Sequence, residues 1–339
     1  MDEAVREVLG DEDAWFVGGA VRDELLARPS YDLDVVCADP ARAARAYARR
    51  AGGFPFALSE RHASWRVAVA DGRTVDFTGV HGTIESDLAR RDFTINAIAQ
   101  VVGDGAYVDP SGGREDLQLR LVRAVSETVF QDDPLRLLRA VRLEDELGFR
   151  LAPLTEELVR GEAQLVTAAA AERVVAELER MSARGYRRLD EVGLLGALGG
   201  TLDDRLDAVD SPRYRLVAAF GDGVRRLPVS AETRRYASAL LRAERPTDGS
   251  ARSVHRFRRQ TEPWASDALA FVGAPELNAA LANARAADPD EPLLRGNELG
   301  IAPGPEVGRL LERIAEERAV GTITTREQAL ELVRRETTP

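Results

Sequence analysis

The chain has 339 residues, which is more than the roughly 250–300 residues at which a single hydrophobic core stops growing, so more than one core is expected. No apolar run approaches the about 20 residues of a membrane span, and the single cysteine, Cys37, excludes an internal disulfide, so a reducing cytoplasm is the expected compartment. The formal net charge of −11 argues against a generally basic nucleic-acid surface, but it does not exclude nucleic-acid binding, because the local distribution of charge matters more than the sum. All 46 basic residues are arginine, which suits bidentate contacts with phosphates and base edges.

Residues 14–120 are predicted to mix helices and strands. Helices are expected over 21–27 and 41–51, where alanine and arginine are frequent. Asp71-Gly72 is a strong signal for a hairpin turn. Strands are expected where short apolar or alternating runs occur, at 14–17, 32–37, 65–70 and 74–77.

After about residue 123 the apolar residues recur at helical spacing. The helix candidates are 156–165, 169–181, 186–198, 212–221, 231–244 and 263–271. The sequence therefore predicts an α+β fold, in which an N-terminal head with a mixed sheet (1–122) precedes an all-α neck (123–185), body and tail (186–339).

The strongest chemical signal is a glycine pair followed by two aspartates. Gly18-Gly19 lies between a predicted strand and helix, where backbone N–H groups can approach a phosphate closely. Asp32 and Asp34 are two residues apart on a predicted strand, so their carboxylates share a face and suit Mg²⁺ ions that also bind substrate phosphates. Asp76 on a later strand is either a third carboxylate of this site or an ordinary charge at a strand end.

Two further segments carry charged residues with a possible role in nucleotide binding. In the segment 87–99, Arg91 could meet phosphates, and Asp92 or Asn96 could hydrogen-bond a ribose hydroxyl. In the segment 132–142, Asp133 and Arg136 are predicted to be i, i+3 neighbours on one helix face. A helix cap and a solvated charged face are the structural alternatives for these two segments.

These segments resemble class II CCA-adding enzymes and bacterial poly(A) polymerases of the nucleotidyltransferase superfamily. The resemblance covers about residues 14–181, and many relatives carry Glu-Asp where this chain has Asp132-Asp133. The matching segments are GGAVRD…DLD (18–34), DLARRDFTINAIA (87–99), DPSGGREDL (109–117), DDPLRLLRAVR (132–142) and AER…EL (171–178).

The resemblance implies a role for each site residue. Asp32 and Asp34 would hold the metal ions, and Asp92 would lie near the incoming ribose. Asp133 and Arg136 would read the incoming base. The residues expected around the triphosphate are Gly18, Gly19, Arg22, Arg139 and Arg142.

Hydrogen-bond chemistry agrees with a base-reading pair. A carboxylate can accept from the amino group of cytosine or adenine, and arginine can donate to the ring nitrogen beside it. Uracil and guanine present a carbonyl in place of that amino group, so pairing with Asp133 would fail. The implied reaction is attack of a tRNA 3′-hydroxyl on the α-phosphate of CTP, and of ATP in some relatives, assisted by two Mg²⁺ ions.

The segment between Asp76 and Asp87 departs from the pattern of CCA-adding relatives. It has only ten residues, FTGVHGTIES, where those relatives carry a longer loop. A shortened loop resembles the CC-adding subgroup, so we expect synthesis to stop after two cytidines. Full CCA addition, A-addition, polyadenylation and a catalytically inactive RNA-binding relative are the alternatives.

The helical body and tail are expected to bind tRNA by contacting its sugar-phosphate backbone and by fitting its shape. Arginines in this region are the candidates, with a solvated surface as the alternative, and no protein partner is predicted. The candidates are Arg225, Arg226, Arg234, Arg235 and Arg252, and above all the tRNA-binding group Arg256, Arg258 and Arg259.

Overall fold

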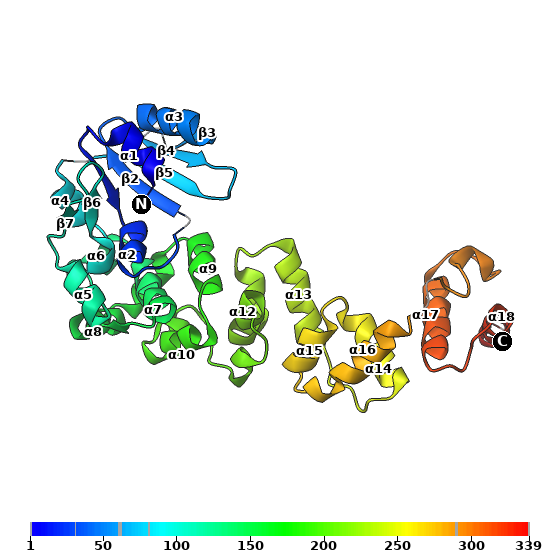
Figure 1. The fold of residues 1–339 in the computed structure, drawn as a ribbon. Coiled ribbons are helices and arrows are strands. Elements are labelled where there is room, and N and C mark those ends of the chain that lie inside the picture. Colours follow the sequence, from blue (N-terminus) through cyan, green and yellow to red (C-terminus); the bar gives the residue numbers. More distant parts are fainter. Residues whose placement is uncertain (1, 31, 60–62, 81, 289–290, 338–339) are drawn as a thin grey trace. The chain divides into compact units, whose positions relative to one another are not determined.

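The computed structural model describes residues 2–30, 32–59, 63–80, 82–288 and 291–337, and it divides into two compact units, Met1–Gly199 and Gly200–Pro339. The first unit begins with a mixed sheet and continues into helices, and every regular element described in the second unit is a helix (Figure 1). The predicted α+β class is confirmed. The finer boundaries at residues 122 and 185 stay predictions.

A seven-stranded sheet forms the head, in the order β3-β4-β5-β2-β1-β6-β7. β2 and β5 run parallel, and all other neighbouring strands run antiparallel. The predicted strands and the hairpin turn are confirmed, whereas the edge strand β3 was not predicted, because a short run containing proline is a weak strand signal. The strands are β1 (Ala14–Val17), β2 (Asp32–Cys37), β3 (Phe54–Ser59), β4 (Ser64–Ala68), β5 (Thr74–Gly79), β6 (Ala99–Val101) and β7 (Tyr107–Val108).

One face of this sheet is packed under α1 (Glu3–Leu9) and α3 (Pro40–Ala51) (Figure 1). Tyr47 of α3 is fully buried there, and its ring centroid lies 5.7 Å from that of Phe77. Apart from the polar Gln100 and the half-buried Trp65, most of the inward-facing residues on the central strands are apolar and buried, which is the alternation expected of a sheet with one covered face. They include Phe16, Val35, Val67, Val75 and Phe77.

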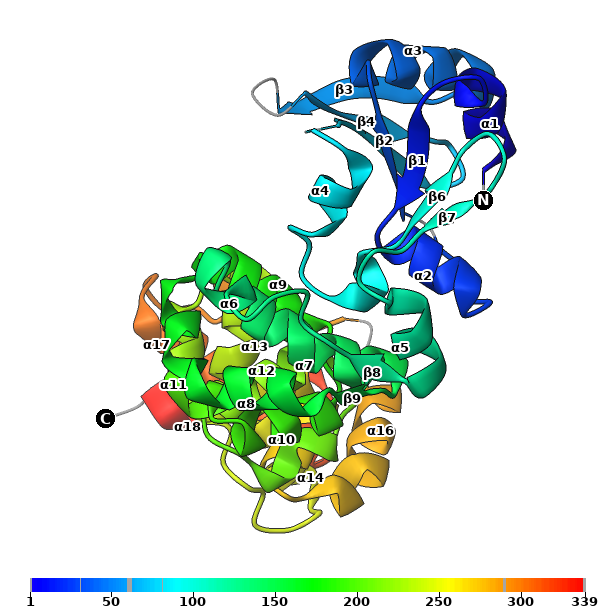
Figure 2. The same cartoon turned by 90° about the vertical axis from the view of Figure 1, so that its left-hand side faces the viewer.

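The other face is only partly covered. α4 (Ile84–Leu88) packs Ile84 and Leu88 against Val17 of β1 and Val36 of β2. Figure 2 shows α4 on the side of the sheet away from α3. β5 ends at Gly79 and α4 begins at Ile84, so the ten-residue segment noted in the sequence lies partly in β5 and partly in α4, with four residues between them, of which His81 lies outside the described residues.

The rest of the first unit is helical apart from one short strand pair. β8 (Leu121–Val122) pairs in parallel with β9 (Arg150–Leu151). The prediction that the chain is entirely helical after about residue 123 was therefore wrong at β9, because a two-residue strand leaves no periodic signal in the sequence. Residues 186–198 form two helices, since the chain turns at Gly193 with φ of +81°. The elements are α2 (Gly19–Leu25), η1 (Thr94–Asn96), α5 (Gly113–Leu119), α6 (Val129–Asp132), α7 (Arg136–Leu147), α8 (Pro153–Gly161), η2 (Ala163–Ala168), α9 (Ala171–Glu179), α10 (Ala183–Glu191) and α11 (Leu194–Ala197).

The second unit confirms the helices predicted at 212–221, 231–244 and 263–271, with ends shifted by one or two residues. It is built from η3 (Asp204–Asp207), α12 (Pro212–Phe220), η4 (Gly221–Arg226), α13 (Ala231–Arg242), α14 (Ala251–Thr261), α15 (Ala265–Phe271), η5 (Pro275–Leu277), α16 (Asn278–Ala286), η6 (Gly296–Glu298), α17 (Pro305–Ala319) and α18 (Arg326–Thr337). Across the described residues, no helix combines the length and apolar character that crossing a membrane requires.

Candidate active site

Three aspartates meet on the open face of the head sheet. Asp34 of β2 and Asp76 of β5 are direct partners in the parallel ladder, and Asp32 lies two residues before Asp34 on the same face. The Asp32 carboxylate accepts a hydrogen bond of 2.6 Å from the Thr74 hydroxyl. Arg66 binds both oxygens of Asp76 at 2.7 Å, so the third carboxylate already has a cationic partner.

Asp34 is the carboxylate without a partner. Among the described residues, no group donates a hydrogen bond to its carboxylate or forms an ion pair with it. The Asp34 residue is exposed, but the protein atoms around its carboxyl displace part of the surrounding water, and this raises the pKa. The negative charges of Asp76 and Asp32 raise the pKa further, whereas the positive charge of Arg91 lowers it. This uncompensated negative charge is the environment that a divalent cation relieves.

The glycine turn lies directly beside Asp34. Gly18 has φ of +73°, a conformation that favours glycine. A Cβ atom at this position would lie 2.9 Å from Nη1 of Arg91 and 3.2 Å from Oδ2 of Asp34. The structure therefore brings together residues from three separate segments of the sequence, Gly18-Gly19, Asp34 and Arg91, and Gly19 is the first residue of α2.

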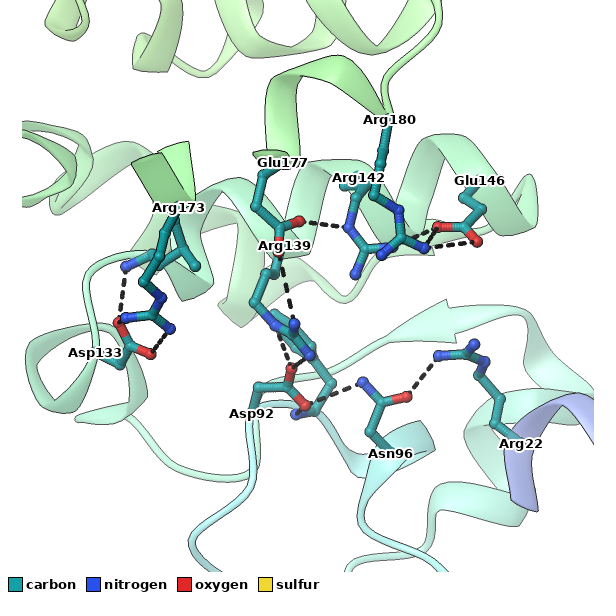
Figure 3. A network of polar contacts seen from close by, with 12 residues as sticks. Arg22, Asp92, Asn96, Asp133, Arg139, Arg142, Glu146, Arg173, Glu177 and Arg180 are labelled. Carbon is teal, nitrogen blue, oxygen red and sulfur yellow. Dashed lines mark hydrogen bonds and ion pairs between the residues drawn. The ribbon is translucent and has the colours of Figure 1, made fainter. Parts of the chain in front are cut away.

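A chain of hydrogen bonds links Arg22 to Asp92 (Figure 3). The buried Arg22 donates from Nη1 to Oδ1 of Asn96 at 2.7 Å, and it also forms an ion pair with Asp23. Asn96 in turn donates to Oδ1 of Asp92 at 3.0 Å. Arg22 is thus held in place by the same segment that was predicted to meet the ribose.

Asp92 is only 6% exposed and accepts a two-pronged contact from Arg139 of α7, with both nitrogens within 2.8 Å of Oδ2 (Figure 3). Burial alone would raise the pKa of Asp92. The charge of Arg139 and the hydrogen bonds from Asn96, Arg139 and the Phe93 amide outweigh burial and hold the pKa below its ordinary value. Arg139 therefore binds a carboxylate in this structure.

Arg142 is buried, whereas the sequence placed it at the triphosphate. Its guanidinium forms ion pairs with Glu177 of α9 and Glu146 of α7, and Arg180 also contacts Glu146 (Figure 3). Glu177 lies 3.6 Å from Arg139 as well, so one carboxylate holds both arginines.

The expected pairing of Asp133 with Arg136 on one helix face was wrong. Asp133 precedes α7 with an extended backbone, and its carboxylate binds Arg173 of α9 at 2.9 Å and 3.3 Å. The Arg136 guanidinium donates instead to the backbone carbonyls of Arg90 and Val129. Pro134 and the residue after it form a turn before α7 begins at Arg136, so Asp133 is not part of that helix, although the charge of Arg136 still helps to lower the pKa of Asp133.

Several residues that contact the predicted site residues were not singled out in the sequence, among them Arg66, Arg173 and Glu177. Arg173 and Glu177 lie within the segment 171–178, whose spacing gave no chemical reason to single them out. Arg66 lies on β4 opposite Asp76, and only strand register reveals that contact. Arg91 forms an ion pair of 3.0 Å with Asp87 and still lies beside the glycine turn.

The candidate tRNA-binding arginines of α14 all have acidic partners in the second unit. Arg256 binds Glu316, Arg259 binds Glu312, and Arg258 binds Glu262 and Asp288. On α13 the guanidinium groups of Arg234, Arg235 and Arg242 have no such partner among the described residues. These three line a hollow of about 420 Å³ together with Trp264.

The metal-binding capacity of the site comes from few groups. Within the described ranges, no cluster of three or more His, Cys, Asp and Glu side chains is arranged to hold a metal ion. Asp32 and Asp34 form no ion pair with any residue that the structure describes, whereas Asp76 is bound by Arg66. Two carboxylates fit an ion that takes its remaining ligands from substrate phosphates and water.

Comparisons with known proteins agree with this site. A family model described as the poly A polymerase head domain matches residues 14–78 and 60–123, which contain the aspartates and the glycine turn. The chain is 34% identical to the A-adding tRNA nucleotidyltransferase of Deinococcus radiodurans, with 95% of each protein covered. It is 40% identical to the CC-adding tRNA nucleotidyltransferase of Geobacter sulfurreducens, a match that covers 62% of this chain and about half (53%) of that relative.

A solved structure extends the likeness along the whole chain. The CCA-adding enzyme of Bacillus stearothermophilus in complex with CTP has a TM-score of 0.79 and 27% identity, covering 99% of this chain and 98% of that one. Fold and carboxylates therefore define a head of the nucleotidyltransferase class. The chain belongs to the family of class II tRNA nucleotidyltransferases and poly(A) polymerases, so the resemblance seen in the sequence is confirmed.

Proposed function

We propose that the protein extends the 3′ end of tRNA by transferring nucleotides from CTP, and that it stops after two cytidines. The observation that carries nucleotide transfer is the Asp34 carboxylate, which has no partner in the described part of the chain and lies beside Asp32 and the glycine turn. The relatives named above are tRNA nucleotidyltransferases of the CC-, A- and CCA-adding kinds, which supports tRNA as the acceptor. A catalytically inactive relative is disfavoured because both aspartates are present.

The reaction forms a bond between the RNA 3′-oxygen and the α-phosphorus and breaks the bond from that phosphorus to the oxygen of the β-phosphate. Pyrophosphate leaves, and the hydroxyl proton passes to solvent. Gly18 permits a phosphate to approach the backbone closely, and Arg91 adds positive charge there. These two features support a triphosphate site on the β1 side of Asp34.

Asp32 and Asp34 would hold Mg²⁺, which suits their carboxylate oxygens. When bound, the metal lowers the pKa of the attacking hydroxyl and neutralises the charge that develops on the phosphates. Asp76 is tied to Arg66, so we assign it the role of keeping Arg66 in place beside the metal site. Arg22 and Asn96 keep Asp92 oriented for a ribose hydroxyl.

Base selection is assigned to Asp133 and Arg136, which lie on either side of the turn before α7. Arg173 contacts both oxygens of Asp133 and orients the carboxylate. This contact also keeps the pKa of Asp133 low: burial would raise it, but the hydrogen bond from Arg173 prevails. A carboxylate that stays ionised accepts from cytosine or adenine and repels the carbonyl of uracil or guanine.

The limit to CC rests on the connection between β5 and α4. Changing from a pyrimidine to a larger purine requires the pocket to rearrange after the second addition. Only residues 80–83 join the two elements, and His81 lies outside the described residues, so little chain is present for a moving loop. Asp133 and Arg136 accept adenine as well as cytosine, so the stop is geometric and depends on the RNA end.

Two acceptors test this proposal. A tRNA lacking its last three nucleotides and a tRNA already ending in CC are each incubated with Mg²⁺, CTP and ATP, and products are resolved at single-nucleotide length. We expect the first tRNA to gain two cytidines and the second to gain nothing. Efficient addition of adenosine to either acceptor would refute the CC limit, and no addition to the first acceptor would refute nucleotide transfer itself.

A further inference from the structure

The edge strand β3 carries two exposed aromatic side chains. Phe54 is 75% exposed and Phe56 is 40% exposed, although large apolar groups are normally covered. They are two residues apart on one strand, so their rings stand on the same face of the sheet. No step of nucleotide transfer derived above uses them.

Strand register connects these rings to the active-site aspartates. Across the sheet, Phe56 is the partner of Arg66, Arg66 of Asp76, and Asp76 of Asp34. Direct partners in neighbouring strands point to the same face. Phe56 and Asp34 therefore stand on one face in a single row, separated by three strand spacings, or about 14 Å.

A second row runs beside the first. Phe54 is the partner of Ala68, Ala68 of Thr74, and Thr74 of Asp32. All four residues in this row are exposed or half-buried. The surface between the aspartates and the two rings is thus continuous and open to solvent.

The direction of attack decides which substrate crosses this surface. The glycine turn lies on the β1 side of β2, next to Asp34, which places the departing phosphates on that side. The attacking and leaving oxygens lie on opposite sides of the α-phosphorus in an in-line displacement. The RNA end must therefore approach from the opposite side of β2, over β5, β4 and β3.

Two features of β3 oppose its pairing with a strand of another molecule. Pro55 has no N–H to donate, and the register shifts between Ala57 and Ser59, which disrupts the edge. The exposed rings are therefore suited to contact through their faces. Single-stranded RNA offers such a partner, because its flat bases stack on aromatic side chains while its backbone carries the phosphates.

We infer that Phe54 and Phe56 form a stacking platform for the single-stranded 3′ end of the RNA acceptor, one to a few nucleotides behind the attacking hydroxyl. This inference rests on the proposed function. Arg66 lies between the platform and the aspartates and neutralises Asp76 at the point where the RNA backbone passes. The platform binds the RNA end because the bases stack on the two rings, and this contact does not depend on the base sequence.

The test compares the full chain with F54A/F56A, F54L/F56L and F54W/F56W, using tRNA that lacks its last three nucleotides. We expect the alanine and leucine pairs to raise the KM for tRNA by at least about fivefold per ring, with little change in the KM for CTP. The tryptophan pair should restore a KM for tRNA near that of the unsubstituted chain. Leu58→Ala is the matched control, because Leu58 is an exposed apolar residue of the same strand that lies outside both rows.

An unchanged KM for tRNA in F54A/F56A would overturn the platform. So would leucine restoring binding as well as tryptophan, since that result indicates a general apolar contact. A change in sedimentation of the protein alone, with tRNA binding unaltered, would assign the face to a second copy of this chain. Fluorescence anisotropy of a labelled tRNA without CTP separates the two proposals: if the unsubstituted chain adds no nucleotide, loss of binding in F54A/F56A still supports the platform.

Discussion

Two neighbouring regions of the first unit carry their charges in opposite ways. On the open sheet face, Asp34 has no cationic partner among the described residues, and Asp32 receives only a threonine hydroxyl. The second region begins at Asp92, the residue after Arg91. There the charges neutralise one another in a largely buried network of Asp92, Arg139, Glu177 and Arg142. The difference teaches that unpaired charge marks where a ligand has to bind, and that paired charge mainly fixes the architecture around it.

The second unit shows the same contrast on a protein surface. α13 and α14 pack against each other, and both are rich in arginine. The arginines of α14 have carboxylate partners, whereas Arg234, Arg235 and Arg242 of α13 line a hollow without one in the described part of the chain. The number of arginines is therefore a poorer guide to phosphate binding than their partners.

The largest effect is expected at the unpaired carboxylates. Asp32→Asn or Asp34→Asn should lower the rate of nucleotide addition by at least about a thousandfold, because metal ions supply several kcal/mol of transition-state stabilisation. The free energy of unfolding should not fall, since no ion pair is removed and repulsion with Asp76 is reduced. Addition assays and denaturant unfolding measure the two quantities, and a near-normal rate in either variant would show that the assignment is wrong.

The next effect concerns base choice. Asp133→Ala and Arg136→Ala should reduce discrimination against UTP and GTP by roughly 5- to 150-fold, as expected when a bidentate interaction with the base worth about 1–3 kcal/mol is removed. Arg173→Ala should have a smaller effect in the same direction, because Arg173 acts only by holding Asp133. Misincorporation is measured from kcat/KM for each triphosphate. If all three variants still reject UTP and GTP as the parent does, the base-reading assignment fails.

A third prediction addresses the paired network through pH. Asp92→Asn should lower the free energy of unfolding by about 2 kcal/mol at pH 7, below the value for a fully buried pair because Arg139 is one-third exposed. The folded-state pKa of Asp92 is depressed, so its contribution is complete above the unfolded value of about 3.9 and is lost as pH falls through the folded value.

The difference between parent and variant should therefore be constant from pH 6 to 8 and shrink below about pH 4. Urea unfolding at several pH values measures it. A difference that grows on acidification would contradict the sign of the pKa shift. A difference near zero at pH 7 would show that the ion pair of Asp92 with Arg139 does not stabilise the fold.

How much of this could be predicted from the sequence depends on the range of the interaction. The DLD strand and the glycine turn follow from local spacing and strand patterns, and the structure contains them, whereas the place of Asp76 beside Asp34 of β2 was only one of two alternatives in the sequence. Arg173 at Asp133, Glu177 at Arg142 and Arg66 at Asp76 come from 10 to 40 positions away, and no local rule predicts them, whereas Glu146 is a local i, i+4 partner of Arg142. The Asp133–Arg136 error had a local cause, since a turn after Pro134 replaced the expected helical start.

The smallest expected effect tests the comparison on the surface. Two triple variants make the same change in charge: Arg234, Arg235 and Arg242 of α13 to glutamine, and Arg256, Arg258 and Arg259 of α14 to glutamine. A guanidinium that already binds a carboxylate must give up that partner to bind phosphate, so the α13 variant should lose more tRNA affinity. The logarithm of its binding constant should also depend less steeply on the logarithm of salt concentration, by about one unit of slope for each phosphate that the variant no longer binds.

The α14 variant should change the salt slope less and the thermal stability more, because it breaks ion pairs with α17 and with Asp288. The stability loss should stay small, since exposed pairs contribute about 1 kcal/mol or less each. CTP affinity serves as the control and should not move in either variant. An equal or larger change of the salt slope in the α14 variant would show that Arg256, Arg258 and Arg259 bind tRNA phosphates after all. It would also show that an arginine paired with a carboxylate can exchange that partner for a phosphate at little cost in free energy.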